Sequence, residues 1–126
     1  MRRNWLYGFL IFVGCSSRMP LSPPELCEGI QKAHCARLYQ CATTPELQAA
    51  LTALYADQDD CVMTGITMQK PVCSQWTEAK ACGGAGILTW NGDAAPTCLT
   101  DINALSCAKT LTGTLPASCT PSEYCQ

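Results

Sequence analysis

Histidine and basic residues are scarce in this chain of 126 residues, and their scarcity argues against two classes of function. The single histidine, His34, excludes a multi-histidine metal site, and any histidine-dependent triad would have to use it. Lysine and arginine number eight against ten acidic residues, for a formal charge of −2. Nucleic acids attract clustered cations, so we expect no nucleic acid as a partner.

Long apolar runs are missing as well. The run from Trp5 to Val13 would span roughly 14 Å as a helix, against about 30 Å of hydrocarbon in a bilayer, so a permanent transmembrane helix is excluded there. Arg2 and Arg3 precede the run and Gly14 follows it, which is the order of an export signal. We expect residues 1–14 to be removed, leaving six basic and ten acidic residues, a net charge of −4.

The tetrapeptide Phe12-Val13-Gly14-Cys15 resembles the lipobox of bacterial lipoprotein signals, although Phe12 stands where leucine is usual. In that motif the cysteine is diacylated on sulfur before cleavage. The resemblance implies that Cys15 is lipidated, becomes the first residue of the mature protein and anchors it to a membrane. Two or three acyl chains make such attachment stable, whereas one chain is marginal. An ordinary signal cleaved nearby, with Cys15 left as a thiol, is the alternative.

The residues after Cys15 bear on location. In the general lipoprotein-sorting pattern an aspartate directly after the cysteine favours the inner membrane, so Ser16 implies the outer membrane, on its periplasmic or surface face. Polar residues and prolines fill the segment to Pro24, which predicts a flexible tether. The chain thus divides into a signal peptide (1–14), a lipidated N-terminus and tether (15–24) and a disulfide-rich helical domain (25–126).

Cysteine is abundant, with eleven in the chain. This density is typical of secreted domains whose cores are too small to be stable without cross-links. With Cys15 assigned to the lipid, the remaining ten form an even set, and we expect all of them to be paired. These are Cys27, Cys35, Cys41, Cys61, Cys73, Cys82, Cys98, Cys107, Cys119 and Cys125.

Spacing leaves the connectivity of these ten cysteines open, but it excludes two pairs. Cys27 and Cys35 would lie about 12 Å apart along one helix, too far for a disulfide. Cys98 and Cys107 would lie about 13.5 Å apart in the same way. We therefore expect each of these cysteines to pair with a different segment of the chain.

Start signals and apolar periodicity predict a mainly α domain, an irregular antiparallel helical bundle stapled by disulfides. Ser22-Pro23-Pro24-Glu25 is a capping box that opens a helix of about five turns reaching Cys41. Thr43-Thr44-Pro45-Glu46 opens a second helix, whose apolar stripe consists of Leu47, Leu51, Leu54 and Tyr55.

The later helices carry weaker signals. The acidic run 57–60 favours a third helix through the helix dipole, although Gly65 weakens the pattern. Another helix is expected between Cys73 and Cys82, and the last is expected to start at an Asp93 cap and continue through Cys107. From Leu111 onward we expect a loop-like tail pinned by its cysteines.

Trp90 is the one candidate binding residue. It closes an extended segment that begins at Ile87 and precedes the turn Asn91-Gly92. Because aromatic side chains dominate binding hot spots, a tryptophan on a short connection flanked by glycines can form a recognition tip. Packing of Trp90 against the helices is the alternative interpretation.

We find no catalytic, cofactor or metal site in the sequence. No two cysteines are separated by the two to four residues that structural zinc modules reuse. A calcium loop starting at Asp57 would have Val62 where glycine is needed and Met68 where glutamate belongs, so helix capping explains the aspartates better. Gly83 to Gly86 lacks the lysine of a phosphate-binding loop. We expect a protein that is not an enzyme.

The pattern as a whole resembles small cysteine-rich lipoproteins common in myxobacteria and related bacteria. The resemblance lies in the lipobox, the cysteines of the first helix and the runs Leu105-Ser106-Cys107 and Pro116-Ala117-Ser118-Cys119. That group has no assigned activity, so the resemblance implies a cellular location and a fold only. We expect an envelope lipoprotein with a binding or structural role toward a protein, glycan or lipid. A secreted hydrolase, protease inhibitor or lipid carrier is the alternative.

Overall fold

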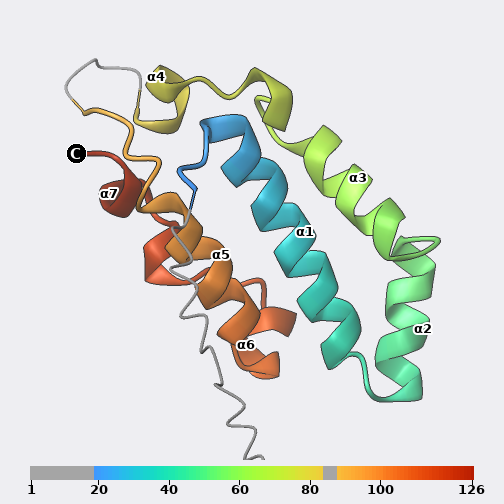
Figure 1. Cartoon of the computed structure of the whole chain (residues 1–126). Coiled ribbons are helices and arrows are strands. Elements are labelled where there is room, and N and C mark those ends of the chain that lie inside the picture. The colour runs from blue at the N-terminus through green and yellow to red at the C-terminus, as the bar shows by residue number, and fades with distance from the viewer. Residues whose placement is uncertain (1–18, 84–87) are drawn as a thin grey trace, which may run out of the picture.

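One long helix, α1 (Pro23–Cys41), runs through the middle of the protein (Figure 1). The structure is a computed structural model and describes residues 19–83 and 88–126, so the signal peptide and Cys15 lie outside the described residues. α1 begins at the predicted capping box, where the Ser22 N–H donates to Glu25 Oε2 at 2.7 Å. This bond stabilises the carboxylate and lowers the pKa of Glu25.

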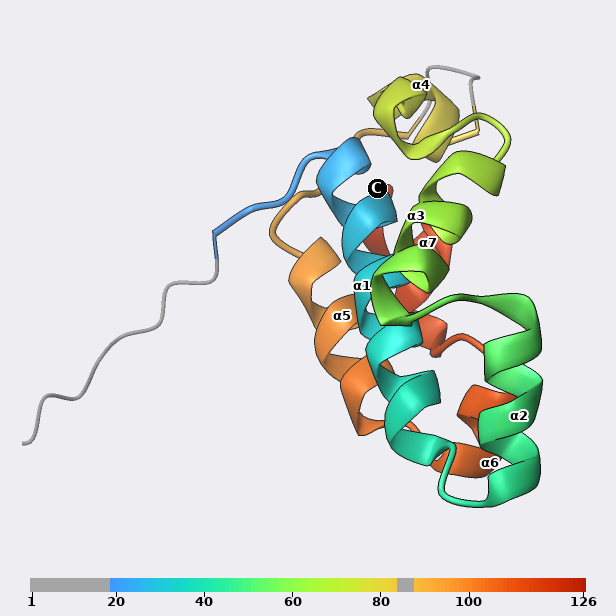
Figure 2. The same cartoon turned by 90° about the vertical axis from the view of Figure 1, so that its right-hand side faces the viewer.

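Two helices run antiparallel to α1. They are α2 (Pro45–Leu54) and α3 (Gln58–Met68), both at positions that the sequence predicts (Figures 1 and 2). Thr44 caps α2 by accepting a hydrogen bond from the Leu47 N–H at 3.3 Å, one residue later than the predicted cap. Asp57 caps α3 by accepting from the Asp60 N–H at 2.8 Å, which confirms the capping role of the acidic run.

The predicted helix between Cys73 and Cys82 is wrong as a single element. It is divided into a 3₁₀ turn, η1 (Cys73–Gln75), and a short helix, α4 (Glu78–Ala81). The chain becomes extended at Trp76, and the Thr77 side chain then accepts from the Lys80 N–H at 3.2 Å and starts a new helix. A second hydroxyl cap inside an apolar pattern therefore breaks the helix.

The prediction of one helix from Asp93 through Cys107 is wrong at both ends. The helix α5 (Ala95–Ala104) has Ala94 at its N-cap, while Asp93 donates its backbone N–H to the side chain of Asn91 at 3.2 Å. The chain then leaves the helix, and Ser106 caps a new one, α6 (Cys107–Leu111). Because α2 and α3 return the chain to the end where α1 begins, α5 starts at that end and runs in the same direction as α1 (Figures 1 and 2).

The C-terminal tail is more ordered than the loop that we predict from the sequence. It contains a 3₁₀ turn, η2 (Ala117–Cys119), and one turn of helix, α7 (Pro121–Tyr124). Its last residues pair with the segment before α5: Thr89 and Gln126 exchange backbone hydrogen bonds of 2.6 and 2.9 Å, and an isolated antiparallel bridge joins Trp90 to Cys125. The described part of the extended segment is thus held by the C-terminus.

Five disulfides connect the elements and confirm the prediction that all ten cysteines are paired. Neither of the two pairs that we excluded is formed, and every bridge joins different elements or connecting segments. The Cα–Cα distances lie between 4.7 and 6.0 Å. The pairs are Cys27–Cys73, Cys35–Cys61, Cys41–Cys107, Cys82–Cys125 and Cys98–Cys119.

The main core lies between α1, α5 and the C-terminal tail. Leu26 and Ile102 are fully buried at its centre. Four of the eight residues in this cluster are half-cystines, so covalent cross-links take the place of larger aliphatic side chains. In the described residues, no helix combines the length and the apolar character needed to cross a bilayer.

Candidate binding groove

The helix α2 stands apart from the core. None of its ten residues is buried, although the sequence predicts an apolar stripe on one of its faces. It lies between Cys41 and Cys61 in the chain and contains no cysteine, so no disulfide ties it to the bundle. Helices of a bundle usually bury their apolar faces against one another, but the predicted apolar stripe of α2 stays at least partly exposed.

The apolar stripe of α2 forms one wall of an open groove, which we call the α2 groove. Its volume is about 260 Å³. Leu54 is 71% exposed and Leu111 is 42% exposed, so apolar surface remains accessible there. The lining residues are Leu38 and Ala42 at the end of α1, Leu47, Ala50, Leu51, Leu54 and Tyr55 of α2 and its C-cap, and Leu111 of α6.

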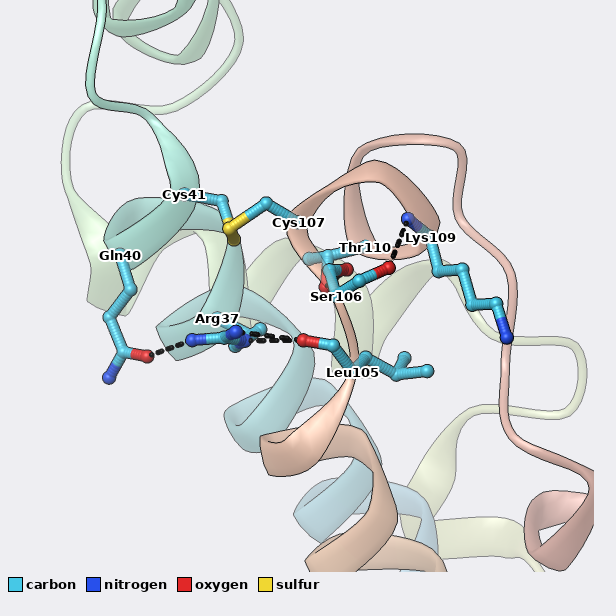
Figure 3. The surroundings of a disulfide bond; sticks show 8 residues. All are labelled: Arg37, Gln40, Cys41, Leu105, Ser106, Cys107, Lys109 and Thr110. Carbon is cyan, nitrogen blue, oxygen red and sulfur yellow. Dashed lines mark hydrogen bonds between the residues drawn. A yellow bond between two sulfur atoms is a disulfide. The ribbon is translucent and has the colours of Figure 1, made fainter.

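The opposite wall of the α2 groove is fixed by covalent and polar contacts. Cys41 at the end of α1 is bonded to Cys107 at the start of α6 (Figure 3). Beside this bridge, Arg37 donates through Nε and Nη2 to the carbonyl oxygen of Leu105, at 3.0 and 2.8 Å. In Figure 2 α6 lies partly behind α2, and Leu111 of α6 lines the same groove as α2. The groove thus has one rigid wall and one wall without a cross-link.

A second hollow of about 240 Å³ adjoins the α2 groove and shares Ala42 and Leu51 with it. Tyr39 lines this hollow. Partial desolvation and the carboxylates of Asp57 and Asp60 raise the pKa of the Tyr39 hydroxyl. Asp57 and Asp60 therefore lie close enough to Tyr39 to interact electrostatically with its hydroxyl.

His34 lies on α1 beside Cys35 and is half-buried. Its Nδ1 atom is buried and finds no hydrogen-bond partner among the described residues. Burial without a counter-charge lowers the pKa of the imidazole, which keeps the ring neutral at neutral pH. Within residues 19–83 and 88–126, no three His, Cys, Asp or Glu residues gather where they could hold a metal ion.

Trp90 packs against the main core, in agreement with the alternative to a binding tip that the sequence allows. Its indole N–H donates to the carbonyl oxygen of Leu21 at 2.9 Å, and its ring centroid is 5.1 Å from that of Tyr124. Both rings belong to the main core or its edge. The rest of the glycine-rich connection, residues 84–87, lies outside the described residues, and so does Cys15.

Sequence patterns do not reveal the α2 groove, because an apolar stripe at helical spacing has the same appearance whether it is covered or open. One signal was present. The nineteen residues between Cys41 and Cys61 form the longest stretch between consecutive cysteines, and they hold an entire uncross-linked helix. A helix without a cross-link in a domain held by cross-links is a candidate for a free surface.

No family model matches this chain, and no curated protein and no solved structure does so either. The fold and the α2 groove therefore have to be interpreted from their own geometry.

Proposed function

We propose that this protein is a lipid-anchored lipoprotein of the bacterial cell envelope whose domain binds a partner and performs no catalysis. The observation that carries the proposal is the use of cysteine. Five disulfides consume ten of the eleven cysteines, and the eleventh is Cys15, the cysteine of the lipobox-like tetrapeptide. The domain does not need Cys15 for its fold, which leaves the sulfur for acylation.

The position of the α2 groove supports a binding role. The tether enters at the N-terminus of α1, whereas the groove lies at the C-terminal end of the same helix. Nineteen residues of helix separate the two ends by roughly 28 Å. An anchored domain would thus hold its accessible apolar surface at the end opposite its tether, where an envelope protein, glycan or lipid could reach it.

The disulfides support an oxidising location, and Ser16 supports the outer membrane as the destination. A cross-linked scaffold suits this address because it resists unfolding outside the cytosol, where ATP-dependent chaperones do not act. The scaffold would present the groove and the anchor would hold it at the membrane surface.

The anchor is tested by labelling with a clickable palmitate analogue, followed by membrane fractionation. The wild-type chain should incorporate the label and sediment with outer membranes. Cys15→Ala should abolish labelling, whereas Ser16→Asp should keep the label and move the protein to the inner membrane. Unlabelled wild-type protein in the soluble fraction would refute the proposed anchor.

A further inference from the structure

We infer that the α2 groove binds a short, cationic amphipathic helix of a partner protein. The inference rests on the proposed binding function and names its site and the class of its ligand. Three features carry it: the lining of the groove, the charges at its two ends and the freedom of one wall.

The lining suits the apolar face of a helix. It consists of leucine and alanine side chains with one tyrosine, and it follows α2 from Leu47 to Tyr55, which is about 12 Å. A partner helix of about two turns would match this length, with its apolar residues at three- and four-residue spacing. Leu54 and Leu111 are already exposed, so docking would remove apolar surface from water without unfolding the core.

The charges around α2 are acidic at both ends. Glu46 is the only charged residue of α2 and lies in its first turn, and Asp57, Asp59 and Asp60 follow its C-terminal end. All four are exposed. The C-terminal end of the α2 dipole adds negative potential near Tyr55, while the positive N-terminal end of α3 offsets part of the charge of Asp57 and Asp60. A ligand with basic residues beside its apolar stripe would be complementary to this arrangement.

Two cations belong to the opposite wall and do not change this balance. Arg37 is already bonded to the carbonyl oxygen of Leu105 and to Gln40. Lys109 is exposed on α6, where it is the one basic residue. The four carboxylates therefore dominate the edges of the groove.

The same charges argue against two other occupants. A second copy of the chain, with its α2 packed against this one in either direction, would bring acidic ends together, because both ends of α2 are acidic. A fatty acid or anionic phospholipid would place its negative head group beside these carboxylates. A cationic peptide meets no such repulsion.

The free wall allows the groove to adapt. Because no disulfide holds α2 and none of its residues is buried, its displacement would break few packing contacts. The fixed wall, held by the Cys41–Cys107 bridge, keeps the remaining half of the site in place. A ligand could thus be clamped between a rigid and a movable surface.

The test uses the lipidated mature chain in phosphatidylcholine vesicles and a fluorescent peptide of about 14 residues, with leucines at helical spacing and lysines elsewhere. Binding is measured by anisotropy, with protein-free vesicles subtracted. We expect saturable binding of this peptide to the wild-type protein. A peptide with glutamates in place of the lysines should bind at least about tenfold more weakly.

Matched variants locate the binding. Ala50→Trp would fill the groove, while Ala49→Trp adds the same side chain at the adjacent, exposed position outside the lining. Ala50→Trp should weaken binding about tenfold or more, and Ala49→Trp should leave it unchanged. Asp59→Lys should weaken binding about threefold, whereas Glu78→Lys, the same charge change on α4, should not. Circular dichroism checks that each variant is folded.

Equal weakening by Ala49→Trp and Ala50→Trp, or equal binding of the lysine and glutamate peptides, would overturn the inference. So would uptake of oleate that Ala50→Trp blocks, or a wild-type dimer in sedimentation that this variant dissociates, since these results assign the groove to a lipid or to a second copy. Acylation of Cys15 is measured by mass on the same protein. Peptide binding can therefore fail while the anchor is verified.

Discussion

Single residues show that polar contacts supplement the disulfides at the end of the bundle that carries the α2 groove. Arg37 bridges α1 to the end of α5 through two hydrogen bonds to one carbonyl oxygen, and it does so next to the Cys41–Cys107 bridge (Figure 3). A charged donor strengthens such bonds relative to neutral ones. The sequence does not predict this contact, because it joins residues 68 positions apart.

Arg37→Ala should lower the free energy of unfolding by roughly 2 kcal/mol, since two bonds from a charged, partly buried donor are lost. Urea unfolding with intact disulfides measures the change. Lys32→Ala, an exposed substitution on the same helix, should change stability by less than about 0.5 kcal/mol. Equal effects of the two substitutions would show that the contact with Leu105 contributes nothing.

His34 makes stability depend on pH. Its pKa is lowered by burial, so the unfolded chain binds a proton at a higher pH than the folded one. The neutral imidazole therefore favours the folded state above about pH 6.5, and the free energy of unfolding falls as the pH decreases toward the lowered pKa. In urea titrations between about pH 7.5 and pH 5, the His34→Gln variant should lose less of its free energy of unfolding than the wild-type protein does. An unchanged pH dependence in the variant would assign the effect to other groups.

Elements were predictable where a start signal and an apolar run agree. The sequence locates α1, α2 and α3 correctly because Ser22, Thr44 and Asp57 lie at or beside the predicted starts. It fails where a later hydroxyl side chain restarts the helix, as Thr77 and Ser106 do, because such residues are also tolerated inside helices. Disulfide partners and the open face of α2 depend on tertiary geometry, which periodicity does not contain.

The helix α2 should be the least stable of the helices longer than eight residues in the described chain. It has no buried residue and no cross-link, so its amide hydrogens should exchange by local opening, faster than those of α1. Thr44→Ala removes its cap and should accelerate exchange further by about fivefold, equivalent to about 1 kcal/mol. Hydrogen exchange followed by mass spectrometry measures both.

Protection of α2 equal to that of α1 would contradict this account of a movable wall. Ser106→Ala serves as the comparison, because α6 loses an equivalent cap but remains tied to α1 through Cys107. Its effect on exchange in α2 should be small.

The whole molecule is a cross-linked domain of modest size, and its stability should depend on the bridges. Each disulfide typically contributes about 2 to 4 kcal/mol, so five are comparable to the net stability of a small domain. Reduction by dithiothreitol should therefore unfold the protein at room temperature, with loss of most of the helical circular dichroism signal. Retention of that signal after complete reduction would show that the noncovalent core is sufficient.

The measurement that tests the central claim most directly is the intact mass of the native protein, alkylated without reduction and then mapped by proteolysis. The account predicts a chain that starts at an acylated Cys15, takes up no alkylating reagent and contains the five bridges between its elements. A mass without acyl chains, together with several alkylated cysteines, would contradict it.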